Sequence, residues 1–397
     1  MDIPYRSARA SVSFASLWLS RWALNYNWAV TGAILPALFA GLPASAWQIA
    51  IIVVATPIGQ GVTEIPGGML SLRLGPGRVA LLGEVILGLC AIGSAASTSW
   101  GMMAAFRLGL GIGSGLFWPS SMALLRVSSP FRGFPTAVGV YNTSGSFALI
   151  AALVGGLAIE GAFGWRSAML VGGVAQLACA WAIWGAFRSP IGEMPDRAVA
   201  PPGYGVRAVI GSRSLWALTL AGAGMWGLAY ILPQYALAFA SVVHPTWNLG
   251  VVAAMVSIAG LIGVPAGILG GELATRTGRL RTILVMSAST MAAVALLVPV
   301  VDLVRLGGII LLFGAADGVA FAVLYAIPAD IPEIPVQGLP LAIGTIDSVQ
   351  TLVGSGIALS FGLIVGLSGF GVAWATIGVV AAFPLLLLAW VHARRSF

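Results

Sequence analysis

The sequence predicts an all-α polytopic membrane protein with twelve transmembrane helices in two pseudo-symmetric six-helix bundles. Composition and an internal repeat support this prediction. Hydrophobic residues make up 59% of the 397 residues, whereas charged residues make up only 8%. Soluble globular proteins do not have this composition. Because lipid offers no hydrogen-bond partners to the backbone, long apolar segments must satisfy their amides internally as helices.

The repeat is clearest in two short basic segments. Residues 67–78 read GGMLSLRLGPGR and residues 270–281 read GGELATRTGRLR, so the second follows the first by 203 positions. The glycines of residues 107–115 align at the same offset with residues 314–318. A fixed offset indicates a duplication. We therefore expect three regions: a first bundle over 1–187, a cytoplasmic linker over 188–212 and a second bundle over 213–397.

Twelve apolar segments are long enough to cross a membrane. A helix that spans a hydrocarbon core of about 30 Å needs about 20 apolar residues. The segments occupy residues 13–40, 46–71, 78–98, 100–125, 134–160, 164–187, 213–241, 247–274, 281–300, 304–328, 337–366 and 369–392. Each half of the duplication thus contains six.

Arginine placement predicts the orientation of the chain, which contains no lysine. With a cytoplasmic N-terminus, 15 of the 19 arginines fall on the cytoplasmic side. We expect a multi-pass protein of the cell membrane with both termini in the cytoplasm. The net charge of +7 then reflects this topology and contact with membrane lipids, and no nucleic-acid partner is expected. Cys90 and Cys179 lie inside apolar segments and are interpreted as buried thiols.

Polar residues inside the spans are the candidate functional residues, since a charge at the bilayer centre costs about 2.5–3.5 kcal/mol or more. The first span carries Arg21, Asn25 and Trp28 on one helical stripe, with Tyr26 beside it. The second carries Gln60 and Glu64, and the third carries Glu84. The fourth and fifth spans add Arg107, Trp118 and Asn142.

Arg21, Glu64 and Glu84 lie at a common depth, roughly 10–12 Å from the cytoplasmic helix ends at about 1.5 Å per residue. We therefore expect Arg21 to pair with Glu64 or Glu84. Such a pair could take part in transport or could only fasten helices together. The glycines of the fourth span allow a neighbouring helix backbone to approach closely.

The second bundle carries two carboxyl groups near the middle of its spans, Asp317 and Asp347. A desolvated carboxyl favours its neutral form and can carry one proton. The alternative is that each is neutral or hydrogen-bonded to Gln350, Thr351 or backbone and only stabilises packing. Gln350 is also a cavity candidate for substrate binding. The aromatic candidates in this half are Trp226, Tyr230 and Tyr325, which could line a cavity or only pack helices.

The two basic segments and the Arg107–Gly113 run resemble the motifs of the major facilitator superfamily, and the resemblance covers essentially the whole chain. It implies two bundles that rock about a central site to give alternating access. It also implies that the loops after the second and eighth helices take part in gating. Their candidate residues are Gly68, Arg73, Gly75, Arg78, Gly271, Arg276, Gly278 and Arg279. In the fifth helix, Ala151-Ala152 replaces the Gly-Pro pair of the antiporter motif.

The favoured interpretation is a secondary active transporter, acting as a monomer, that moves a small polar organic solute by proton symport. Asp317, Asp347, Glu64 and Arg107 are the proton-coupling candidates. An exporter or antiporter of amphipathic compounds is the first alternative, and a non-transporting membrane receptor of the same fold is the second. The residues predict no enzyme, cofactor or metal site, because no nucleophile with its base and no cluster of metal ligands is present.

Overall fold

The computed structural model describes residues 3–128, 134–187, 209, 211–278, 285–286, 288–290, 293–294, 297, 302–324, 331, 334 and 339–395. Every regular element within these ranges is a helix. The chain forms two compact units. The first comprises Met1–Ala44 and Ala55–Ala198, and the second comprises Ser45–Val54 and Val199–Phe397.

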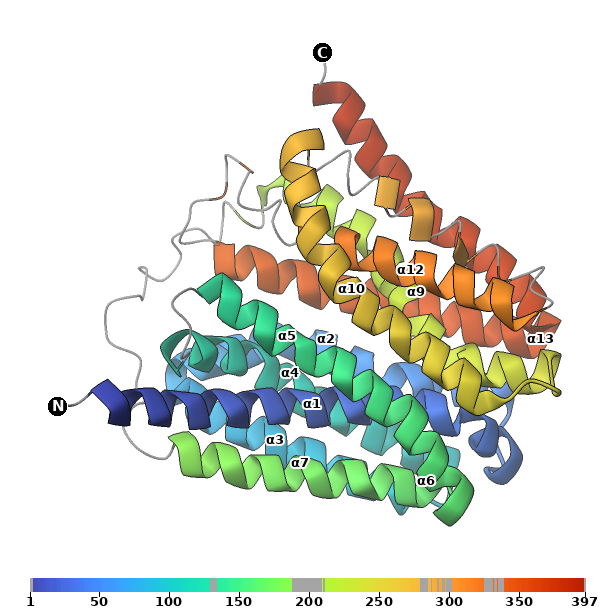
Figure 1. Ribbon diagram of the computed structural model, residues 1–397, viewed down its shortest axis with the longest axis horizontal. Coiled ribbons are helices and arrows are strands. Elements are labelled where there is room, and N and C mark those ends of the chain that lie inside the picture. The colour runs from blue at the N-terminus through green and yellow to red at the C-terminus, as the bar shows by residue number, and fades with distance from the viewer. Residues whose placement is uncertain are drawn as a thin grey trace. The chain divides into compact units, whose positions relative to one another are not determined.

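The first unit is a bundle in which α1, α3 and α7 run side by side, and α4 packs against α3 (Figure 1). A five-residue π-helix joins α5 and α6 into one continuous segment. Its elements are α1 (Ile3–Gly41), α2 (Ala46–Leu74), α3 (Pro76–Ala95), α4 (Trp100–Ser128), α5 (Phe134–Ile150), η1 (Ala151–Gly155), α6 (Gly156–Phe163) and α7 (Trp165–Phe187).

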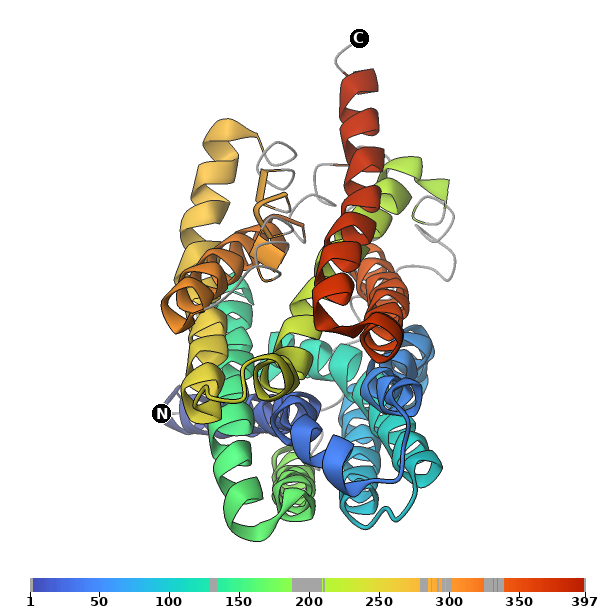
Figure 2. The ribbon, with the colours of Figure 1, turned by 90° about the vertical axis from the view of Figure 1, so that its right-hand side faces the viewer.

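The second unit pairs α9 with α13 and α10 with α12. Its elements are α9 (Arg213–Val243), α10 (Leu249–Thr277), α12 (Leu303–Leu324) and α13 (Leu339–Arg395). Ser212 and Asn248 cap the first turns of α9 and α10 with their side-chain oxygens. The α13 element contains two helices that meet at Gly369, and Figure 2 shows its two arms running in different directions.

The first turns of α2 belong to the second unit, although the sequence places them in the first bundle. The Tyr230 hydroxyl of α9 donates to the carbonyl oxygen of Val53 at 2.6 Å. A side chain at Gly362 of α13 would collide with Ala50. This segment therefore packs closely on α9 and α13, and the predicted domain boundaries remain a prediction.

Nine helices within the described residues are long and apolar enough to cross a membrane. The helix α1 is not among them because Asn25, Asn27 and Arg21 lower its hydropathy. One of the nine is the continuous range Ala342–Val379, which contains the break at Gly369. The span expected over 281–300 lies mostly outside the described residues. The all-helical membrane fold is thus confirmed, and the count of twelve stays a prediction.

Backbone conformation supports the duplication. Four glycines have positive φ among the described residues: Gly75 (84°), Gly164 (81°), Gly278 (89°) and Gly369 (81°). Gly75 and Gly278 are 203 positions apart and end α2 and α10, while Gly164 and Gly369 are 205 apart and separate consecutive helices. Glycine adopts this conformation without the penalty that a side chain would bring. The two halves therefore turn the chain at matching places.

The same helix contacts recur in both halves. A side chain at Gly111 of α4 would strike the carbonyl oxygen of Thr56 on α2, and one at Gly314 of α12 would strike that of Ala259 on α10. Both residues of the second pair follow those of the first by 203 positions. These glycines allow the paired backbones to approach closely, as expected for membrane helices.

Substituting Gly111 with alanine is expected to destabilise the protein by about 1–3 kcal/mol, because the added methyl group must push the α2 backbone away. Gly101, on the same helix, faces open space, and a methyl group added there would meet no atom within 4 Å. Gly101→Ala is therefore the matched control, and it should be neutral or slightly stabilising. Thermal unfolding in detergent measures both, and equal shifts for the two variants would contradict the close approach of α2 and α4.

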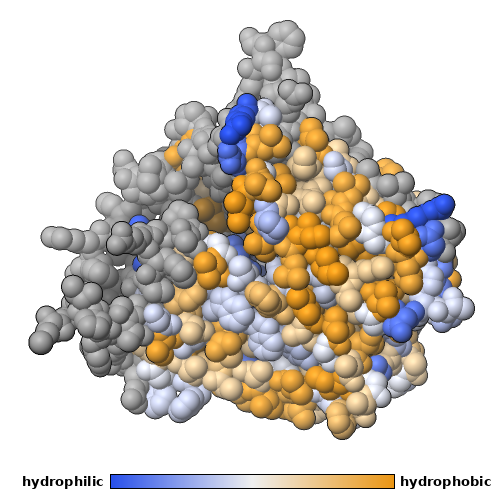
Figure 3. All heavy atoms as spheres, viewed as in Figure 1, coloured by the Kyte–Doolittle hydropathy of each residue, from blue (hydrophilic) through white to orange (hydrophobic). Residues whose placement is uncertain are grey.

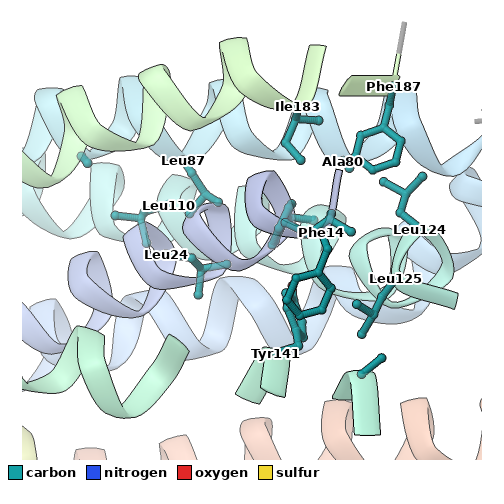
Figure 4. Close-up of a cluster of buried hydrophobic side chains, with 14 residues drawn as sticks. Phe14, Leu24, Ala80, Leu87, Leu110, Leu124, Leu125, Tyr141, Ile183 and Phe187 are labelled. Atoms are coloured by element: carbon teal, nitrogen blue, oxygen red, sulfur yellow. The ribbon is translucent and has the colours of Figure 1, made fainter. Parts of the chain in front are cut away.

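Hydrophobic side chains from α1, α3, α4, α5 and α7 converge in the core of the first unit (Figure 4). Other large apolar side chains point outward: Trp181 is 74% exposed and Ile268 is 72% exposed. Apolar residues also cover much of the coloured surface in Figure 3. An apolar exterior of this extent is what contact with lipid requires.

Candidate functional site

The guanidinium of Arg21 lies against two aromatic rings of the first unit. Its guanidinium carbon lies 3.9 Å from the ring centroid of Trp118 on α4 and 4.8 Å from that of Tyr141 on α5. The two rings stack, with centroids 6.2 Å apart, and the Tyr141 hydroxyl donates to Ser121 Oγ at 2.8 Å. Such a cation–π contact is worth about 0.5–2 kcal/mol. The planar guanidinium group is well suited to bidentate binding of a carboxylate or phosphate.

A second polar cluster lies where α2 and α4 pack. Gln60 Nε2 donates to Glu64 Oε1 at 2.7 Å, and Ser114 Oγ on α4 donates to Gln60 Oε1. Glu64 is only 5% exposed. The predicted neighbours Gln60 and Glu64 are thus joined on one helix, and Ser114 connects them to α4.

Glu84 belongs to a third, fully buried cluster. Gln176 of α7 donates from Nε2 to Glu84 Oε2 at 2.6 Å, and Gln176 Oε1 accepts from Asn27 Nδ2 of α1 at 3.2 Å. Arg107 of α4, also buried, donates from Nη1 to the Asn27 carbonyl oxygen at 2.7 Å. This chain of hydrogen bonds ties α3, α7, α1 and α4 together.

The pairing of Arg21 with Glu64 or Glu84 stays a prediction. The contacts above place Arg21 on its aromatic rings, Glu64 beside Gln60 and Glu84 beside Gln176. The charged candidates of the first bundle therefore fall into three groups: Arg21, Glu64, and Glu84 with Arg107.

Asp317 is a charged candidate residue of the second unit. It is half-buried on α12, and within the described part of the chain its Oδ1 atom has no hydrogen-bond partner. An oxygen shielded from water without a partner carries a desolvation cost. Asp317 thus keeps a buried carboxyl oxygen available to a proton or another donor.

The repeat explains why the environment of Asp317 differs from that of the matching residue in the first unit. At the offset of 203, Asp317 takes the place of Ser114, while Gly263 and Gly267 take the places of Gln60 and Glu64. The side chains that bond Ser114 in the first unit therefore have no counterpart on α10. The carboxyl group of this cluster in the first unit, Glu64, is on α2, whereas that of the second unit, Asp317, is on α12. The α10 positions that match Gln60 and Glu64 are glycines.

The side chains of Gln350 and Thr351 form no hydrogen bonds with Asp317 or Asp347. Gln350 is buried on α13, and a side chain at Gly222 of α9 would collide with its amide. Among the described residues, neither the Gln350 amide nor the Thr351 hydroxyl has a hydrogen-bond partner. Asp347 is half-buried one turn earlier on α13. The Gln350 and Thr351 side chains therefore bond neither carboxyl group, and whether the aspartates only stabilise packing stays an open alternative.

The aromatic candidates of α9, Trp226 and Tyr230, stack on each other. Their ring centroids are 5.4 Å apart at 18°, and the Tyr230 hydroxyl donates to the Val53 carbonyl oxygen. Tyr230 is buried, whereas Trp226 is half-buried. Trp226 is therefore the more accessible of the two.

The remaining predicted residues are placed as follows. Asn25 donates to the Arg21 carbonyl oxygen at 2.8 Å, and Tyr26 is buried with its hydroxyl on the Ala168 carbonyl oxygen of α7 at 3.0 Å. Tyr26 thus faces the bundle interior. Trp28 is half-buried and Asn142 is exposed. Tyr325 lies outside the described residues.

The predicted gating loops follow α2 and α10. Arg73 and Arg78 are exposed on either side of Gly75, and Arg276 forms an exposed ion pair with Glu272 at 2.6 Å. Exposed pairs of this kind contribute little stability. Gly68 and Gly271 lie within the two helices, Gly278 ends α10, and Arg279 lies outside the described residues.

Five residues in these clusters were not among the predicted site residues: Asn27, Ser114, Ser121, Tyr141 and Gln176. Gln176 is an amide in the middle of an otherwise apolar segment, which is a usable sequence signal. Ser114 and Tyr141 gain importance only from their partners on other helices. Within the described residues, no group of three or more His, Cys, Asp or Glu side chains could hold a metal ion.

Comparison with known proteins identifies the family. The family model described as Major Facilitator Superfamily matches residues 17–358. The chain belongs to the major facilitator superfamily. It is therefore a multi-pass membrane protein of this superfamily, as the sequence motifs predicted.

Individual relatives of this superfamily member are distant. The MFS-type transporter Rv1250 of Mycobacterium tuberculosis is 24% identical over 173 residues, a match that spans 42% of this chain and 30% of that protein. Crystal structures of a bacterial homologue of the human lysosomal transporter Spinster superimpose over almost the whole chain. The inward-facing occupied form gives a TM-score of 0.76 at 16% identity, covering 98% of this chain and 97% of that one. The inward-facing unoccupied form gives a TM-score of 0.74 at 16% identity, covering 97% of this chain and 96% of that one. At this identity the likeness establishes the fold alone.

Proposed function

We propose that the protein is a secondary active transporter that moves a small polar organic solute by alternating access, driven by proton symport. The observation that carries the proposal is Asp317, whose buried Oδ1 lacks a partner among the described residues and lies opposite glycines on α10. Retaining such a group inside a membrane protein is costly, which favours a functional role. The topology with both termini in the cytoplasm is part of the proposal.

Arg21 is the proposed contact for an acidic group of the solute. Its guanidinium contacts Trp118 and Tyr141, which supports a side-chain position that is already formed when the solute binds. The proposed division of roles is that Arg21 in the first unit recognises the solute, whereas Asp317 in the second unit takes up and releases the proton.

A two-stage experiment tests this function. Thermal-shift screening of the purified protein against a panel of metabolites identifies a ligand, since binding to the folded state alone raises the Tm. The labelled ligand is then supplied to proteoliposomes with and without an inward proton gradient. We expect concentrative uptake only with the gradient. Uptake that reaches the same level without it would contradict proton coupling.

A second candidate is an exporter or antiporter of amphipathic compounds, favoured by one observation. The π-helix Ala151–Gly155 lies where the antiporter motif has its Gly-Pro pair, and it is followed by Gly156, whose added side chain would touch Val30 of α1 at 3.1 Å. π-Helical turns interrupt regular helices and often lie at functional sites. In the vesicle experiment, this candidate predicts solute movement that is opposite in direction to the proton gradient.

A further inference from the structure

Glu84 is a carboxyl group that the proposed transport step does not use. It lies in the middle of α3 and is 0% exposed. Gln176 donates to its Oε2 atom at 2.6 Å. Within the described part of the chain, no group makes a hydrogen bond of ordinary geometry to its Oε1 atom. The hydroxyl of Ser20 on α1, itself 0% exposed, is close enough to the carboxyl to interact with it.

The charges around Glu84, like its hydrogen bonds, bear on whether the carboxyl is protonated. Over the described residues, the structure contains no ion pair to this carboxyl. The titratable groups that face it from other helices are the Cys179 thiol of α7 and the Tyr141 hydroxyl of α5, which bring no positive charge. The arginines of the adjoining helices contact other groups: Arg21 lies on Trp118, and Arg107 donates to the Asn27 carbonyl oxygen.

An ionised Glu84 would therefore be a charge buried without a counter-ion, which is among the most costly arrangements in a protein. A protonated Glu84 removes that cost. The proton on Oε1 can donate to Ser20 Oγ, while Oε2 continues to accept from Gln176. The Ser20 hydroxyl can donate or accept, so the absence of a counter-ion, and not the hydrogen-bond count, favours the protonated form.

We propose that Glu84, Ser20 and Gln176 form a proton-binding site between α1, α3 and α7 of the first unit, distinct from Asp317. The bound proton keeps the carboxyl neutral, so that it can link three helices through Gln176 and Asn27. This inference does not depend on the proposed transport mechanism, because a transporter without proton coupling would hold the same proton.

Infrared spectroscopy of the full-length protein in lipid tests the site directly. A protonated carboxylic acid has a carbonyl stretching band that carboxylates and amides lack, and the band shifts in D₂O. The spectrum of the wild type minus that of Glu84→Gln at neutral pH should contain this band. The spectrum of Asp317→Asn should retain it, which separates the two sites.

Stability provides the second readout. Glutamine keeps the neutral charge, the acceptor for Gln176 and a donor toward Ser20, so the Tm of Glu84→Gln should match that of the wild type. Glu84→Ala removes both links, so its Tm should fall. The proposal would be overturned by the absence of the band from the wild-type difference spectrum. It would equally be overturned if Glu84→Gln lost as much stability as Glu84→Ala, since the negative charge would then be required.

Discussion

Replacing Asp317 with asparagine is expected to abolish accumulation of the solute against its gradient while leaving solute exchange across the membrane intact. Asparagine preserves the size of the side chain on α12 but cannot bind and release a proton. Exchange of external for internal solute needs no net proton movement, so it should persist. Accumulation and counterflow of the labelled ligand, measured in the same proteoliposomes, separate these two outcomes.

The matched control for this prediction is Asp302→Asn. The Asp302 side chain is 45% exposed and forms an ion pair with Arg305 at 3.2 Å, so its loss should leave accumulation unchanged. The coupling role of Asp317 would be refuted by full accumulation with unchanged proton dependence in Asp317→Asn. Loss of both accumulation and counterflow would instead indicate that Asp317 binds the solute.

Truncating Arg107 to alanine is expected to destabilise the protein by about 2–5 kcal/mol, the range of large-to-small substitutions in a core. Arg107 is 1% exposed, and its Nη1 atom donates to the Asn27 carbonyl oxygen. Its own carbonyl oxygen accepts from Thr56 Oγ1 at 3.0 Å. Alanine leaves a cavity between α1 and α4 and removes the donor to Asn27. Titration with a denaturing detergent, followed by tryptophan fluorescence, measures the loss.

Arg126 offers the comparison on the same helix. It is exposed in the last turn of α4, so Arg126→Ala should change stability by no more than about 0.5 kcal/mol. Arg107→Lys should lie between the two, because lysine keeps the charge but not the planar fork. Equal effects of Arg107→Ala and Arg126→Ala would show that the buried arginine does not join α1 to α4.

Much of the architecture could be predicted because it depends on patterns that are local or repeated. Long apolar segments predicted the helices, and the offset of 203 predicted that Gly75 and Gly278 would end equivalent helices. Two features were beyond such reasoning. The π-helix at Ala151–Gly155 has no proline to mark it, and the attachment of Ser45–Val54 to the second unit depends on contacts with α9 and α13.

The sequence could predict which candidate residues are costly to place in a membrane, but it could not predict which residues they contact. Charge in an apolar segment identified Arg21, Glu84 and Asp317. Their partners come from helices far away in sequence, as Tyr141 does for Arg21 and Gln176 for Glu84. The pairing of Arg21 with Glu64 or Glu84 rests on depth alone and stays a prediction. Contacts with aromatic rings and amides depend on how each helix is rotated about its axis, which helical periodicity alone does not determine.

The pH inside solute-supplied proteoliposomes tests the central claim most directly. Vesicles containing a trapped pH-sensitive dye and either the wild type or Asp317→Asn receive the ligand found by thermal shift, without any imposed proton gradient. Symport through Asp317 predicts that the ligand acidifies the interior of wild-type vesicles and leaves the pH of Asp317→Asn vesicles unchanged. Equal acidification in both, or ligand uptake by the wild type without any change in pH, would contradict the claim.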